Sequence, residues 1–128
     1  MLCLFCLVSD DGGGKLYLGG YKAAVNITWL QQTNIGLVVN TARGLEHVLG
    51  PRYQQKLVRR QQECPDIEIL DFLLNDDLKQ IVDIEELLAV IQKISDDLDS
   101  GSSVLVHCAQ VYCSNVQNIQ SFLLTISG

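Results

Sequence analysis

The sequence predicts an α/β domain in which parallel strands alternate with helices. Two short apolar runs of strand length, at 35–40 and 104–106, have the pattern of strands buried on both faces of a sheet. Between them, apolar residues recur at steps of three and four from about residue 80 to residue 98, which indicates an amphipathic helix. Strands that alternate with helical segments are typical of a doubly wound α/β sheet.

The first 34 residues predict two strands and a helical turn. The apolar run 1–8 is typical of a buried strand or a disordered leader, and residues 10–14 form a turn. A short strand follows at 15–20, closed by two glycines. Asn26 is expected to cap a helical turn that contains Trp29 and Leu30 and ends before Asn34.

The middle of the chain returns to the sheet twice. The strand at 35–40 is expected to lie centrally, and a loop follows it at 41–50. Residues 52–63 predict a surface helix with Tyr53, Leu57 and Val58 on one face. A strand at 67–72 leads into the acidic turn 75–77, which can cap the helix 80–98, and Gly101 ends that helix.

Composition narrows the class of protein and its partners. With 128 residues, 48% of them hydrophobic, the chain can form one domain with a real core. A net charge of −6 argues against nucleic-acid or anionic-membrane binding through bulk electrostatics, and the main basic cluster lies at 52–60. No stretch approaches the roughly 20 apolar residues of a membrane-spanning helix. We therefore expect no nucleic-acid and no membrane partner.

The five cysteines are scattered and odd in number, unlike a secreted disulfide framework. They indicate a reducing cytoplasmic or nuclear location. Cys3 and Cys6 have a Cys-x-x-Cys spacing, but structural zinc usually shows two close ligand pairs, and this pair lies inside an apolar run. We expect no metal ion and no cofactor; a reversible disulfide between Cys108 and Cys113 is a further alternative.

The last predicted strand ends in a His-Cys pair. Residues 104–110 are Val-Leu-Val-His-Cys-Ala-Gln. A thiol at the carboxyl end of a strand lies where ligands gather in open α/β sheets, and the N-terminus of a following helix favours the thiolate. After Gln110, the chain continues Val-Tyr-Cys-Ser, without a glycine or an arginine.

This segment, with earlier ones in the same order, resembles the dual-specificity branch of the cysteine-dependent protein phosphatases. The matching segments are Leu-Tyr-Leu-Gly-Gly at 16–20, the strand 35–40, Ile-Leu-Asp at 69–71, the helix around 84–94, and residues 101–110. The resemblance covers roughly 15–110. It implies a partial phosphatase-type sheet flanked by helices and lacking the C-terminal helices of the full fold. Residues 1–14 would be a strand or leader, and 111–128 a divergent tail.

The family's chemistry, carried over by position, implies roles for several residues. A thiolate attacks phosphorus, backbone N–H groups and an arginine hold the phosphoryl oxygens, and an aspartic acid protonates the leaving oxygen. Cys108 matches the nucleophile and His107 the residue that orients the loop and tunes the thiol. Strand context favours Asp71 as the acid, whereas spacing to the cysteine favours Asp76 or Asp77, which we prefer.

The loop after the nucleophile departs from the family pattern. Ala109, Gln110 and Ser114 match substrate-binding positions, but Ser114 stands where the arginine belongs and Val111 replaces the glycine. One neutral hydroxyl in place of a guanidinium, which would make two charge-assisted hydrogen bonds, weakens phosphate binding and transition-state stabilisation. An abrupt change inside a motif is what an alternative exon, a frameshift or a gene-model error produces.

These departures lead to two expectations. The first is a protein of the protein-dephosphorylation family, acting on a phosphoprotein or phosphopeptide, that is inactive or weak. The second is a pseudophosphatase that binds or scaffolds a partner. Neither a preferred phosphoamino acid nor an oligomeric state follows from the sequence.

Overall fold

The computed structural model describes residues 3–8, 13–74 and 84–109, and these contain one five-stranded sheet in the order β1-β2-β5-β3-β4. β2, β5, β3 and β4 run parallel, and β1 pairs antiparallel with β2 at the edge. The predicted α/β class is confirmed. The strands are β1 (Cys3–Val8), β2 (Lys15–Gly19), β3 (Ile35–Ala42), β4 (Glu68–Leu74) and β5 (Ser103–His107).

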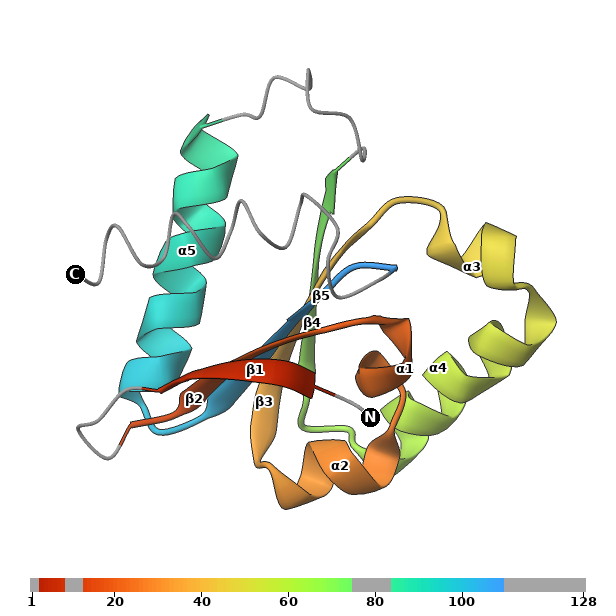
Figure 1. Ribbon diagram of the computed structural model, residues 1–128, viewed down its shortest axis with the longest axis horizontal. Helices are drawn as coiled ribbons and strands as arrows, with labels where there is room; N and C mark the ends of the chain where they lie inside the picture. Colours follow the sequence, from red (N-terminus) through yellow and green to blue (C-terminus); the bar gives the residue numbers. More distant parts are fainter. Residues whose placement is uncertain (1–2, 9–12, 75–83, 110–128) are drawn as a thin grey trace.

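Helices cover both faces of the sheet (Figure 1). α5 (Ile84–Asp99) lies alone on one face in the described part of the chain. The other face carries α1 (Tyr21–Ala24), α2 (Ile27–Gln32), α3 (Leu45–Leu49) and α4 (Pro51–Glu63). Since side chains alternate along a strand, β5 serves both layers: Leu105 joins the cluster with α1 and α2, while Val104 and Val106 join the cluster with α5.

Several elements predicted from the sequence are confirmed. β3 is central, because it pairs with β5 on one side and with β4 on the other. Asn26 caps α2, with its Oδ1 accepting a hydrogen bond from the Trp29 N–H at 2.9 Å. Gly101 ends α5 with a φ of +96°, a conformation that favours glycine.

The structure corrects the prediction at three places. α1 was not predicted, and α3 occupies part of the expected loop 41–50. Helices of four or five residues contain too few apolar positions for a periodic pattern. On α4 the inward face includes Tyr53, Leu57 and Arg60, whereas Val58 is 55% exposed. A charged residue thus takes a buried position that the apolar pattern had given to valine.

Two further predictions concern membrane-spanning helices and segments that lie outside the described residues. No described helix is both long enough and apolar enough to cross a membrane. The acidic turn 75–77 and the tail from 110 onward lie outside the described residues. The start of the predicted helix 80–98 does too, so α5 is described from Ile84.

Two glycines that face the same loop predict a graded effect on stability. A Cβ at Gly14 would overlap the backbone carbonyl of Ser102, whereas a Cβ at Gly36 would meet the Ser102 side chain at 3.0 Å. A backbone cannot rotate away as a hydroxymethyl group can. We expect Gly14→Ala to lower the free energy of unfolding by about 2 kcal/mol and Gly36→Ala by less than about 1 kcal/mol. Urea unfolding followed by circular dichroism measures both, and equal losses would contradict the expectation.

Candidate functional site

The His-Cys pair lies at the carboxyl edge of the parallel part of the sheet. β5 is flanked by β2 and β3, and Cys108 and Ala109 follow its last residue. In open α/β sheets, ligands bind outside the carboxyl ends of the strands. The fold therefore places Cys108 at the end of a central strand, between the ends of two neighbours.

Hydrogen bonds from both neighbouring strands hold this strand end. The Thr41 hydroxyl at the end of β3 donates to the His107 carbonyl oxygen at 2.9 Å. The Cys108 N–H donates to the Gly19 carbonyl oxygen of β2 at 3.4 Å. Thr41 is fully buried and Cys108 is 4% exposed, so the backbone that carries the thiol is fixed inside the fold.

Cys108 and His107 have different neighbours. Cys108 is part of the buried cluster that contains Val106 and inward residues of α3, α4 and α5. His107 lines a hollow on the face covered by α3 and α4, together with Tyr53 and Arg60. Tyr53 belongs to both groups, so the two environments meet beside α4.

His107 is neutral at physiological pH. It is 2% exposed, and burial lowers its pKa to about 4; the nearby Arg60 cation acts in the same direction. A hydrogen bond to the Cys108 carbonyl oxygen opposes the shift, with Nδ1 at 3.3 Å from that oxygen. Because a carbonyl oxygen only accepts, Nδ1 carries the hydrogen in this contact. The imidazole therefore contributes no positive charge near Cys108.

Asp71 shares a row with His107 but is separated from it by Asn40. The register pairs Asn40 with both residues, one on each side. The distance across two strand spacings is about 10 Å. The Asn40 side-chain amide donates to the Asp71 Oδ1 at 3.3 Å, and Asp71 itself is exposed. Asp71 thus lies on the His107 face, one strand beyond Asn40.

The remaining predicted site residues are only partly described. Ala109 is half-buried directly after Cys108. Asp76, Asp77, Gln110 and Ser114 lie outside the described residues. No group of three or more His, Cys, Asp or Glu side chains in the described ranges could hold a metal ion.

Tyr53 and Arg60 line the hollow beside His107, but sequence reasoning gave neither of them a role at the site. The hollow measures about 330 Å³. Burial is the first cause that raises the pKa of Tyr53 to about 12, and burial also lowers the pKa of Arg60. Both residues come from the segment that the sequence marked as a basic surface helix. An arginine in such a run carries no local signal that it points inward.

Comparisons with known proteins bear on the fold. Neither a protein-family model nor a curated protein sequence matches the chain. The solved structure of human DUSP28 superposes with a TM-score of 0.67 at 18% identity, covering 94% of this chain and 68% of that one. A single-residue variant of DUSP28 gives 0.67 at 21% identity, over 87% and 65%. The fold is that of a dual-specificity phosphatase.

The structure of a mouse protein described as a dual-specificity phosphatase, in complex with zinc tungstate, has a similar fold. Its TM-score is 0.66 at 23% identity, over 86% of this chain and 59% of that one. The chain therefore spans 59–68% of the length of these three structures. The dual-specificity phosphatase fold agrees with the resemblance found in the sequence and with a partial form of that fold.

The buried His107 predicts a loss of stability on acidification. Its folded-state pKa of about 4 lies below the ordinary value of 6.5, so the unfolded chain takes up this proton first as the pH falls. Stability present at pH 7 is lost as the pH falls through the window from 6.5 to 4. This group alone should remove about 2 kcal/mol between pH 7 and pH 5.

Urea unfolding at several pH values measures this loss. The chain has two histidines, and the exposed His47 provides a matched control. We expect His107→Asn to flatten the pH dependence and His47→Asn to leave it unchanged. The same slope in His107→Asn as in the unmodified chain would refute the assignment.

Proposed function

We propose that this chain is a dual-specificity phosphatase-like protein that is related by descent to enzymes of protein dephosphorylation and that has weak or no turnover of its own. One observation carries the proposal: the His107–Cys108 pair lies at the end of the central strand β5, at the ligand-binding edge of a phosphatase-type sheet. The substrate class is a phosphoprotein or phosphopeptide. A thiolate nucleophile also suits the reducing cytoplasmic or nuclear location that the cysteine pattern indicates.

Cys108 is the proposed nucleophile, with the following backbone as the phosphate-binding segment. Hydrogen bonds to the carbonyl oxygen before it and from its own N–H support this role, because they fix the point at which the loop begins. A preorganised loop of N–H groups stabilises charge that develops on phosphoryl oxygens. We propose Ala109, Gln110 and Ser114 as contacts of the phosphoryl group.

The general acid is proposed to be Asp76 or Asp77 rather than Asp71. Asp71 is two strand spacings from His107, with Asn40 of the intervening strand β3 between them. A proton donor must come within hydrogen-bond reach of the leaving oxygen. The aspartate pair, 31 and 32 residues before Cys108 in the sequence, remains the better candidate.

Weak or absent turnover follows from the two replaced loop residues. Ser114 offers a neutral hydroxyl where the family has an arginine, and removing one transition-state donor costs about 10²- to 10³-fold in rate. Arg60, a basic residue distant in sequence, is not placed to compensate. Its Nη1 donates to the Ala24 carbonyl oxygen at 2.7 Å, and it lies on the His107 face.

A second candidate function is a pseudophosphatase that holds a phosphoprotein without hydrolysing it. The observation that favours it is the combination of a retained His107–Cys108 pair with Val111 and Ser114 in the loop. Backbone N–H groups bind an oxyanion without an arginine, whereas transition-state stabilisation suffers more from its loss.

Turnover of a small aryl phosphate and of a phosphotyrosine peptide tests the proposed chemistry. The full chain should show little or none, and the double variant Val111→Gly with Ser114→Arg should raise the rate about 10²-fold or more. Adding Cys108→Ser to the double variant should abolish that gain. Appreciable turnover by the unmodified chain that disappears in Cys108→Ser would disprove inactivity, while a double variant without turnover would count against the phosphatase site.

Binding of a fluorescent phosphotyrosine peptide distinguishes a scaffold that binds phosphopeptides from a protein whose phosphatase-like loop binds none. The scaffold function predicts saturable binding by the unmodified chain and by Cys108→Ser, and at least about ten-fold weaker binding of the unphosphorylated peptide. Equal affinity for both peptides would argue against the scaffold.

A further inference from the structure

A groove lies between α4 and the sheet face of β4, and Cys108 does not line it. Two adjoining hollows form it, one of about 330 Å³ that reaches His107 and one of about 770 Å³ that reaches the end of α4. They share four lining residues, which define what we call the α4–β4 groove: Glu46, Leu57, Arg60 and Ile69. Residues of α3 form part of the lining of the smaller hollow, and the larger one extends to Cys64, Pro65 and Ile67.

Arg60 is a buried cation that borders this groove. It is 7% exposed, and among the described residues no carboxylate lies within ion-pair distance of it. Within the same part of the chain, its guanidinium makes one hydrogen bond, from Nη1 to the Ala24 carbonyl oxygen. A guanidinium has five N–H donors, and burying an uncompensated charge is costly.

The other guanidinium nitrogens are open to the groove. No fully enclosed side-chain nitrogen or oxygen in the described residues lacks a hydrogen-bond partner. The nitrogens of Arg60 that have no protein acceptor therefore keep some exposure, and the exposed space that Arg60 lines is the groove. An anion that enters the groove would supply the missing partner in a charge-assisted, bidentate contact.

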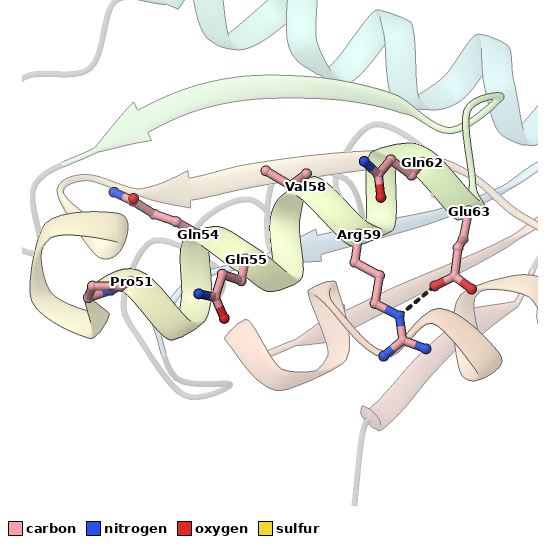
Figure 2. A pocket seen from close by; sticks show the side chains of 7 residues that line it. All are labelled: Pro51, Gln54, Gln55, Val58, Arg59, Gln62 and Glu63. Atoms are coloured by element: carbon pink, nitrogen blue, oxygen red, sulfur yellow. Dashed lines mark hydrogen bonds and ion pairs between the residues drawn. The ribbon is translucent and has the colours of Figure 1, made fainter.

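The walls of the groove are aliphatic and polar rather than basic. Ile69 on β4 is 43% exposed and Val58 on α4 is 55% exposed, so both keep apolar surface available. Figure 2 shows Gln54 and Val58, which also line the larger hollow, on one side of α4, while Arg59 pairs with Glu63 on the other. Glutamine amides can donate to and accept from a peptide backbone. Such walls suit an extended peptide with aliphatic side chains.

The charges around Arg60 limit which anion fits. Glu46 and Asp71, both exposed, line the smaller hollow, as do His47 and the neutral His107. Two carboxylates near one guanidinium repel a phosphate dianion or a nucleic acid more than a single carboxylate. These features favour a single carboxylate over a phosphate or a nucleic acid.

We propose that the α4–β4 groove binds the C-terminal carboxylate and the last aliphatic residues of an extended partner polypeptide, with Arg60 holding the carboxylate. Cys108 does not line the groove, although His107 and Asp71 do, and the proposed binding does not depend on phosphatase turnover. Its ligand carries no phosphate.

A peptide library with defined ends tests the proposal. The full-length chain is exposed to random hexapeptides immobilised through their N-termini, either with free C-terminal carboxylates or as C-terminal amides. We expect enrichment from the free-acid library alone, with Val, Leu or Ile in the last two positions. Selected peptides are then measured by fluorescence anisotropy. Equal binding of the amides, selection of internal acidic residues, or no enrichment would overturn the proposal.

Two neighbouring arginines provide a matched pair of variants. Arg60→Gln should weaken binding of a selected peptide by about 10- to 100-fold, the loss expected for a hydrogen-bonded charged partner. Arg59→Gln removes the same charge from the other side of α4 and should leave affinity within about two-fold. If both variants weaken binding equally, the interaction is diffuse attraction to a basic helix, as a nucleic acid or an anionic membrane would give, and the proposed site is wrong.

A third variant keeps the test valid if Arg60→Gln unfolds. Ile69→Glu changes an exposed side chain and adds a negative charge inside the groove, so it should retain the circular dichroism spectrum and lose at least about ten-fold in affinity. If folded Ile69→Glu binds a selected peptide with unchanged affinity, the groove is not the binding site and the proposal is wrong.

Discussion

The burial of β5 between β2 and β3 is the constraint on which the rest of the molecule depends. All five of its residues are buried, and it pairs along its length with a parallel strand on each side. Full burial of one Val or Leu side chain contributes about 1.5–3 kcal/mol. A strand that is apolar on both faces requires a helical layer on each, which is why α5 lies on one side of the sheet and α1 to α4 on the other (Figure 1).

This constraint also sets the position of the thiol. The backbone of β5 cannot shift without breaking its hydrogen bonds to both neighbours, so Cys108 emerges between the ends of β2 and β3. The Thr41 hydroxyl adds a bond to the carbonyl that precedes the thiol. A nucleophile needs a fixed approach to its target, and the interior of the sheet supplies that rigidity. The reaction itself would further require a general acid and a positively charged group such as the family's loop arginine, and both belong to other segments.

Two chemical environments meet at the end of β5. Cys108 lies in the buried cluster, and His107 lines the hollow that Arg60 borders. The buried Arg60 cation helps to lower the pKa of His107 in this second environment. Tyr53 belongs to both environments, so the proposed phosphatase remnant and the proposed peptide groove are neighbours at one end of the sheet.

The sequence by itself determined the elements with strong periodicity, the cap at Asn26, the stop at Gly101 and the His107–Cys108 pair at a strand end. These features arise from local chemistry: apolar period, side-chain capping and glycine φ. Tertiary structure decided what depends on neighbours distant in the chain. It formed the short helices α1 and α3, buried Arg60 in place of Val58, and put Asn40 between Asp71 and His107. Those outcomes follow from strand order and layer packing, which no local pattern of residues encodes.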